Sequence, residues 1–479
     1  MSYAKLCPRQ YLTLLISSLL LLSLMLYRCR PKEEIFTDSP IELRFSDDTV
    51  LFDTVFSGSP TVVRNVTKRL YIYNTSMNAL RLAMVRLGGG TGSAYKITVD
   101  GIDGAAVSDL EILGKDSLLV LITVSILPAN QNLPFIVTDS LIVEHLGHSQ
   151  QVQLVSWGQD ALFLNGEVIG CDTTWAPNRP VVIYNSALVD SACSLTILPG
   201  TQVYMHNGSN LFVAGTLLVQ GEAENKVHFR GTRLEQRFIN VPGQWGGIIF
   251  LETATSNSVV DHAIIRNATN GIRFGKPDDG NDDPDLLISN SLIRNCTGSG
   301  LLFISTDVDL INTVVGNCQI STISVLAGGA VRLFHCSLAD FASLFQREDP
   351  SLVFSNNLVL ADNSVLRAGL KLTAINSILY GSEDEELLLS NDPGAAFVLD
   401  IRASILRTQL NTLNINGNKI NVNPKFKNQA EVDYQLDTLS PARNAGIPIQ
   451  GLPAALTDFK GISRPQADTV DIGAFERVE

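Results

Sequence analysis

The chain has 479 residues, enough for two or three domains, and 45% of them are hydrophobic, so a large core is available. Its formal net charge of -13 argues against a nucleic acid partner, because phosphate binding needs a basic face.

Residues 1–29 are predicted to be a targeting segment. Two basic residues precede the apolar run Tyr11 to Tyr27, as in a signal peptide, and the run is slightly short for a membrane-spanning helix. The segment resembles that of bacterial lipoproteins, since Leu26 precedes Cys29 by three positions, although Arg28 departs from the small residue usual there. The resemblance implies lipidation of Cys29 and a lipid anchor in the outer membrane. An uncleaved membrane anchor and plain secretion are the alternatives.

Residues 30–34, Arg-Pro-Lys-Glu-Glu, follow this cysteine directly. They resemble the short signal of Lys and acidic residues that sends some Bacteroidetes lipoproteins to the cell surface. A charged linker with no role in sorting is the alternative.

Residues 35–160 contain short alternating segments that predict β-strands, with turn signals such as Gly88-Gly89-Gly90 between them. Several short strands at this spacing predict a β-sandwich. The stretch resembles the immunoglobulin-like modules of bacterial surface proteins, on the residues Phe52 to Phe56, Leu70 to Asn74 and Trp157 to Asp160.

Residues 171–425 repeat with a period of about 22 residues, which predicts a solenoid. The repeat reads Asn-Ser/Thr-aliphatic or a close variant, and its copies begin at Asn290, Asn312, His335, Asn356, Asn376 and Ala403. The first coils, from Leu195 to Gly231, resemble right-handed β-helix proteins of the pectin-lyase-like class. The fold class predicted for the whole chain is therefore all-β, an N-terminal β-sandwich followed by a right-handed parallel β-helix.

The repeated asparagine has a structural interpretation. A corner of each coil needs a residue that tolerates the left-handed backbone region, and asparagine is the usual choice after glycine. Stacked coils place equivalent side chains about 4.8 Å apart, so their amides can form a ladder of hydrogen bonds. These asparagines are predicted to be structural and not catalytic.

Residues 426–479 are predicted to be a C-terminal capping segment. The motifs Asp433 to Leu436, Ser440 to Gly446 and Val470 to Glu476 resemble the terminal segment of many secreted bacterial β-helix proteins. A solenoid needs its last coil covered, because an open sheet edge invites aggregation. Arg464, Asp471 and Glu476 are predicted to form a polar network that fixes this segment; a catalytic role for the carboxylates is the alternative.

The cysteines beyond the targeting segment show no CxxC pair, so a zinc or redox site is not indicated. Cys171 and Cys193 could form a disulfide in an oxidising compartment, but the interpretation favoured here is that they are small apolar fillers. Cys296, Cys318 and Cys336 fall near equivalent repeat positions, where buried thiols are expected.

Two pairs of residues are candidates for ligand binding. Asp285 and Asp307 should stack on neighbouring coils beside the acidic insertion Asp278 to Asp283, where Ca²⁺ could bind; an inert solvated loop is the alternative. Arg266 and Arg294 should also stack and could face a sugar carboxylate; a pair of surface arginines is the alternative. No residue is singled out as catalytic, and no metal ligand set or cofactor motif is recognised.

The sequence thus favours a lipid-anchored protein of the cell envelope, surface-exposed, that serves as a non-enzymatic scaffold or binds glycans or envelope proteins. The alternative is a polysaccharide lyase or glycoside hydrolase of the pectin-lyase-like class. An enzyme needs two or three carboxylates and a base that converge in one groove.

Overall fold

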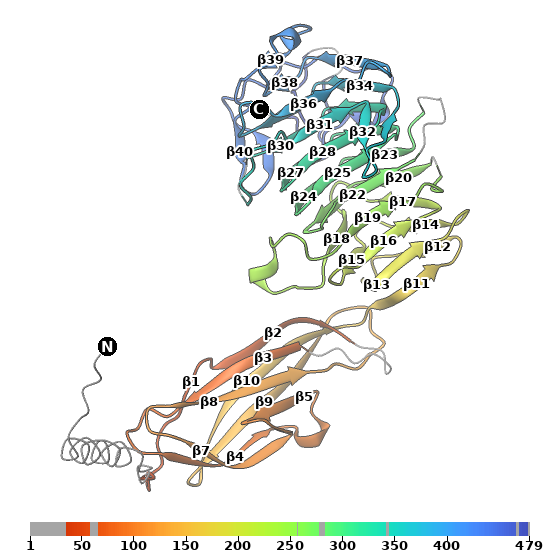
Figure 1. The fold of residues 1–479 in the computed structure, drawn as a ribbon. Helices are drawn as coiled ribbons and strands as arrows, with labels where there is room; N and C mark the ends of the chain where they lie inside the picture. The colour runs from red at the N-terminus through yellow and green to blue at the C-terminus, as the bar shows by residue number, and fades with distance from the viewer. Residues whose placement is uncertain are drawn as a thin grey trace, which may run out of the picture. The chain divides into compact units, whose positions relative to one another are not determined.

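The structure is a computed structural model that describes residues 35–57, 66–255, 257–276, 283–341, 344–465 and 469–477. The targeting segment with Cys29 lies outside the described residues. The chain divides into two compact units. The first comprises residues 1–55, 62–126 and 135–158, and the second comprises residues 56–61, 127–134 and 159–479 (Figure 1).

The first unit is built on two five-stranded sheets, and its interior is a single hydrophobic cluster that includes Phe52, Leu70 and Tyr95. Residues alternate between buried and exposed along strands such as Ser117–Val124, as expected where one face of a sheet meets the core. One sheet has the order β1 (Arg44–Phe45), β3 (Val66–Tyr73), β8 (Ser117–Val124), β5 (Tyr95–Val99), β6 (Ile102–Gly104). The other has the order β2 (Thr49–Phe56), β10 (His148–Gln159), β9 (Phe135–His145), β4 (Leu80–Leu87), β7 (Ala106–Ile112), and η1 (Gly90–Gly92) follows β4.

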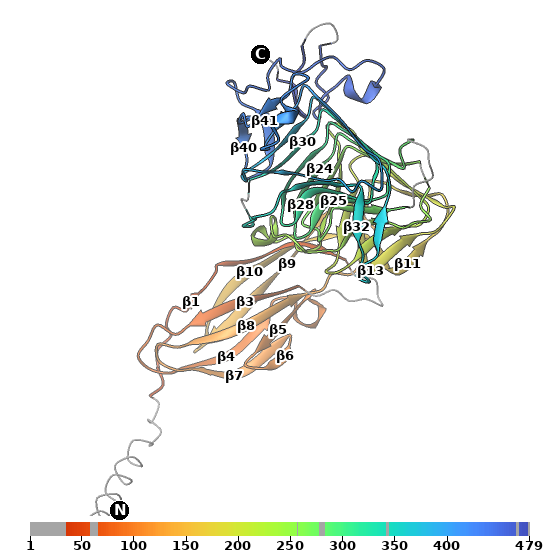
Figure 2. The same cartoon turned by 45° about the horizontal axis from the view of Figure 1, so that its top comes forward.

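The second unit is a parallel β-helix whose coils stack around one hydrophobic core (Figure 2). One face is a nine-stranded sheet: β12 (Thr173–Trp175), β14 (Ser194–Ile197), β17 (Thr216–Gln220), β20 (Ser258–Asp261), β23 (Leu286–Ser289), β26 (Val308–Ile311), β29 (Gly329–Phe334), β34 (Leu370–Ile375), β37 (Phe397–Arg402). The prediction of an all-β chain with a sandwich and a parallel β-helix is confirmed.

An 18-stranded sheet forms the rest of the coils, and most coils contribute two strands to it. It starts with β11 (Leu162–Ile169) and β13 (Val181–Val189). One series of strands continues as β15 (Gln202–Met205), β18 (Val227–Gly231), β21 (Ala263–Arg266), β24 (Leu292–Cys296), β27 (Val314–Cys318), β30 (Ser337–Asp340), β35 (Ile378–Gly381), β38 (Ile405–Leu406), β39 (Lys419–Ile420). The other continues as β16 (Asn210–Val213), β19 (Gly247–Phe250), β22 (Ile272–Gly275), β25 (Ser299–Ile304), β28 (Ser321–Leu326), β31 (Leu352–Ser355), β36 (Leu387–Ser390).

Four short elements leave the coils or follow them. They are η2 (Gln236–Phe238) in the loop before β19, the hairpin β32 (Asn357–Val359) and β33 (Val365–Arg367), and η3 (Asn411–Leu413). The C-terminal segment adds the hairpin β40 (Phe426–Asn428) and β41 (Asp433–Leu436), and η4 (Pro453–Ala455). Among the described residues, no helix is both long and apolar enough to cross a membrane.

The predicted asparagine corner is present after the strands of the nine-stranded sheet. Its residues have a positive φ in six coils, namely His262, Asn290, Asn312, His335, Asn376 and Ala403. Asn312 Nδ2 donates to Asn290 Oδ1 at 3.0 Å, and the Asn376 amide contacts the ring of His335 at 3.1 Å. The predicted ladder of hydrogen bonds is therefore present, and its side chains are buried in the middle coils.

Asn356 does not belong to this ladder, contrary to the sequence pattern. It follows β31, a strand of the other sheet, has no positive φ, and donates to the carbonyl groups of Asp392 and Ala395. The loop that precedes β31 shifts the phase of the repeat, so a similar sequence occupies a different corner. Cys336 is also shifted: Cys296 and Cys318 are in register, whereas Cys336 directly precedes β30 and donates to Leu310 O.

Cys171 and Cys193 form a disulfide that joins neighbouring coils, because the register of β12 and β14 brings the two chain segments together. The interpretation of these cysteines as separate apolar fillers is therefore wrong. Cys193 is buried as well as bonded.

The C-terminal segment lies along the side of the coils and does not form the predicted lid over the last coil. Tyr434 and Phe426 pack in one cluster with Val314, Ala339 and Ile378, which come from three successive strands of one series. Both views show β40 beside β30 (Figures 1 and 2). At the C-terminal end of the core it is Leu413 of η3 that packs against the main cluster.

Candidate functional site

Three arginines form a row on the outer face of the series β18, β21 and β24. Strand β18 alternates, with Val227 and Phe229 buried and Arg230 pointing outward. Arg230 follows Phe229, which is paired with Ile265, so it lies level with Arg266; Arg266 is in turn paired with Arg294. Adjacent parallel strands are about 4.8 Å apart, so the three side chains stack. We call Arg230, Arg266 and Arg294 the arginine column.

The three guanidinium groups differ in their partners. Arg230 Nη2 donates to Tyr204 Oη at 2.6 Å, and its guanidinium carbon lies 4.8 Å from the centre of that ring. Arg294 Nη1 donates to Glu431 O at 2.6 Å and lies 3.7 Å from a carboxylate oxygen of that residue. Arg266, in the middle, makes no side-chain hydrogen bond to another described residue. The Nε atoms of all three are buried without a protein acceptor in the part of the chain that the structure describes.

The arginine column carries more positive charge than its neighbouring described residues balance. Burial, together with the positive charges of Arg230 and Arg294, lowers the pKa of Arg266 to about 10. Burial also lowers the pKa of Arg294, while Glu431 opposes the effect. The pKa of His228, on the same strand as Arg230, falls to about 4 through burial and the charges of Arg230 and Arg266. At neutral pH Arg266 is therefore charged and His228 is neutral.

The column ends where the C-terminal segment begins to cover the sheet. The positions after Arg294 on the next two strands are Gly316 and Ala339. Tyr434 occupies the space above them and donates its hydroxyl to Ala339 O at 2.7 Å. A side chain at Gly316 would collide with Tyr434, because its Cβ would lie 2.3 Å from the hydroxyl oxygen.

Asp285 and Asp307 lie level on neighbouring coils, as predicted, but their oxygens are used inside the protein. Asp285 Oδ2 accepts from the backbone of Asp307 at 3.2 Å, and Asp285 Oδ1 pairs with Lys276. Asp307 Oδ1 accepts from the backbone of Ala330 at 2.6 Å. Both residues are buried. This arrangement ties coils together and leaves the two carboxylates poorly placed to coordinate a cation.

Most of the acidic insertion, residues 277–282, lies outside the described residues. Within the described ranges, no group of three or more His, Cys, Asp or Glu side chains is placed to hold a metal ion. The predicted calcium site therefore gains no support from the geometry of Asp285 and Asp307.

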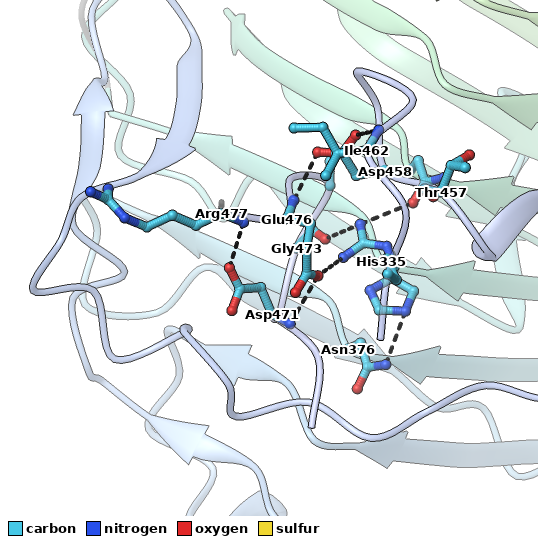
Figure 3. A network of polar contacts seen from close by, with 12 residues as sticks. His335, Asn376, Thr457, Asp458, Ile462, Asp471, Gly473, Glu476 and Arg477 are labelled. Atoms are coloured by element: carbon cyan, nitrogen blue, oxygen red, sulfur yellow. Dashed lines mark hydrogen bonds and ion pairs between the residues drawn. The ribbon is translucent and has the colours of Figure 1, made fainter. Parts of the chain in front are cut away.

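The predicted network of Arg464, Asp471 and Glu476 is present and is buried. Figure 3 shows Asp458, Asp471 and Glu476 within it. Arg464 Nη1 donates to Glu476 Oε2 at 2.8 Å, and the same oxygen accepts from the Asp471 backbone at 3.1 Å. Arg464 Nη2 reaches Asn312 Oδ1 at 3.2 Å and so joins the network to the asparagine ladder. Asp458 accepts from the backbone of Glu476 at 2.8 Å. The network fastens the C-terminal segment to the coils.

Sequence reasoning found Arg266 and Arg294 but missed Arg230. The loop of residues 232–244, which contains η2, lengthens the coil between Arg230 and Arg266 and breaks the period. The available signal was the alternation in Val227 to Gly231, which places Arg230 outward like the other two.

Comparisons with known proteins do not identify a family. No family model matches the chain, and no curated protein matches it. One similar solved structure is a family 123 glycoside hydrolase from Clostridium perfringens, described for glycolipid glycan hydrolysis, with a TM-score of 0.18, 12% identity, 27% of this chain covered and 26% of that chain. Another is the PapD-like domain 7 of human CEP192, with a TM-score of 0.18, 13% identity, 28% of this chain covered and 98% of that domain.

These scores are too low to carry an argument about fold or function. The match spans only about a quarter of the hydrolase chain. Any function assigned to the chain therefore rests on its own residues.

Proposed function

We propose that the chain is an exported, lipid-anchored envelope protein that binds acidic polysaccharides, without cleaving them, along the arginine column. The observation that carries the proposal is Arg266, a half-buried cation between two other cations with no acceptor among the described residues. Guanidinium groups bind carboxylates and sulfates through paired hydrogen bonds. A chain polymer with a negative charge on successive sugars could contact successive coils.

The charge of the whole chain strengthens this argument. The formal net charge is -13, so a row of three arginines, of which only Arg294 pairs with a carboxylate among the described residues, is not a general property of the surface. Stacking three arginines costs free energy through repulsion and desolvation. A bound anion would offset this cost.

A scaffold that binds is favoured over an enzyme of the pectin-lyase-like class. The two candidate carboxylates, Asp285 and Asp307, accept hydrogen bonds from the backbone and pair with Lys276. They lie next to β23 and β26 of the nine-stranded sheet, whereas the arginines lie on the other sheet. In the part of the chain that the structure describes, the arginine column pairs with a single carboxylate, that of Glu431.

Export is supported by two features. The apolar run before Cys29 has the character of a signal peptide, and the disulfide of Cys171 and Cys193 is of the kind that persists in oxidising compartments. Attachment through Cys29, the outer membrane and display at the cell surface belong to the proposal.

The test compares Arg266→Gln with Arg273→Gln in binding to polygalacturonate and to a neutral glucan. Arg273 is an exposed arginine on β22, outside the column, and is the matched control. Loss of charged hydrogen bonds of about 1.5–3 kcal/mol weakens binding roughly 10-fold to 150-fold. We expect this loss for Arg266→Gln alone, and weaker wild-type binding at high salt. Equal affinities of the two variants, or equal binding of the neutral glucan, would refute the proposal.

A further inference from the structure

One end of the sandwich displays apolar side chains that no other described residue covers. Ile35 is 70% exposed, Met77 is 80% exposed and Leu113 is 46% exposed. Isolated exposed apolar residues are common on soluble proteins, whereas a group of them marks a contact surface. We call Ile35, Met77 and Leu113 the apolar tip.

Backbone contacts bring the three residues of the apolar tip together. The backbone of Ala79 donates to Ile35 O at 2.9 Å, so Ile35 lies beside the end of the loop that carries Met77. Leu80 is paired with Ile112, which places Leu113 next to Ala79. Three segments that are distant in the sequence thus expose apolar side chains at the same end of the unit.

The loops of the apolar tip are held in place from inside. Asn74 is buried, and its Nδ2 donates to Asn78 O at 2.8 Å and to Leu113 O at 3.0 Å. The backbone of Lys115 donates to Ser76 O at 2.9 Å. Phe36, next to Ile35, is shielded by the guanidinium of Arg81 at 4.7 Å. Since these hydrogen bonds hold the loops in place, Met77 and Leu113 stay exposed and do not pack into the core.

The apolar tip lies where the chain arrives from its N-terminal segment. Only residues 30–34 separate Cys29 from Ile35. A fully extended chain spans at most about 3.6 Å per residue, so Ile35 lies within roughly 20 Å of an anchored Cys29. Under the proposed attachment the N-terminus is held at a membrane in either case, by a lipid on Cys29 if the apolar run Tyr11 to Tyr27 is cleaved off, or by that run itself if it is retained.

We infer that the apolar tip rests on the surface of the lipid bilayer that holds the N-terminus, with Met77 and Leu113 among the headgroups and upper acyl chains. This contact would fix the sandwich against the membrane and complement the single N-terminal attachment. The inference rests on the membrane attachment in the proposed function and is independent of the arginine column.

The test uses the full-length chain, purified with its N-terminal segment and reconstituted into vesicles of phosphatidylcholine and phosphatidylglycerol with brominated acyl chains. Leu113→Trp carries the probe, and Leu51→Trp is the control, because Leu51 is also 46% exposed but lies on β2, away from the apolar tip. The fluorescence of the wild-type protein is subtracted as the background of its three tryptophans. Both variants must retain the circular dichroism spectrum of the wild type.

We expect brominated lipid to quench the probe at position 113 at least threefold more than the probe at position 51. Equal quenching of the two probes in protein that floats with the vesicles would refute the membrane contact of the apolar tip but not the membrane attachment of the N-terminus. If the protein does not float with the vesicles, both the membrane attachment of the N-terminus and the membrane contact of the apolar tip are refuted. A change in the emission of the probe at position 113 that depends on protein concentration and occurs equally without lipid would assign the surface to a second copy of the chain and would also overturn the inference.

Discussion

Asn312→Ala is the sharpest perturbation of the ladder, because one buried amide serves four contacts. Its Nδ2 contacts Asn290 Oδ1, Ala454 O at 2.9 Å and Thr457 O at 2.8 Å, and its Oδ1 accepts from Arg464. A buried polar group left without a partner costs about 1–3 kcal/mol. A left-handed backbone adds roughly 1–2 kcal/mol for a residue such as alanine. We therefore expect a loss of about 2–5 kcal/mol in the free energy of unfolding.

Asn363→Ala separates the two contributions. Asn363 has a φ of 64° in the exposed turn between β32 and β33, where alanine introduces only the backbone cost. Denaturant unfolding followed by circular dichroism should show Asn312→Ala to be less stable than Asn363→Ala by at least about 1 kcal/mol, at an unchanged slope of free energy against denaturant. Equal losses would mean that the buried amide contributes nothing, and the ladder interpretation would then fail. Polygalacturonate binding by folded Asn312→Ala should be unchanged.

Four further results are expected. Cys29→Ala should abolish acyl labelling and release the protein from membranes; a mature N-terminus elsewhere would contradict this. Replacing Cys171 and Cys193 by alanine should lower stability by about 3 kcal/mol in denaturant unfolding, since the disulfide closes a separation of 22 residues. His228 has a native pKa of about 4, below its unfolded value, so the stability it supports is complete above about pH 6.5 and is lost as the pH falls towards 4; His228→Gln should flatten this decline in a pH series of melting temperatures. Asp307→Ala should lower the melting temperature without changing the heat of calcium titration; a lost calcium signal would restore the metal site.

The fold could be predicted because its signals are local. Asparagine tolerates the left-handed region, and Asn290, Asn312 and Asn376 do occupy such corners. The alternation of buried and outward residues in β18 likewise follows from the strand itself. Asn356 was misplaced because a similar sequence follows a loop that shifts the phase of the coils. The disulfide of Cys171 and Cys193 depends on coil register, which composition does not report.

The extent of the candidate site could not be predicted, since it is set by residues far along the chain. The column stops at Arg294, where Gly316 and Ala339 make room for Tyr434. A fourth arginine at the position of Gly316 would collide with the ring that anchors the C-terminal hairpin. The same hairpin brings Glu431 to Arg294, so it neutralises one end of the column and leaves Arg266 without an anion. The C-terminal segment, which is fastened to the coils, therefore also determines which arginines remain available to a ligand. The repeat of about 22 residues does not predict this, because the C-terminal segment lies outside the repeat.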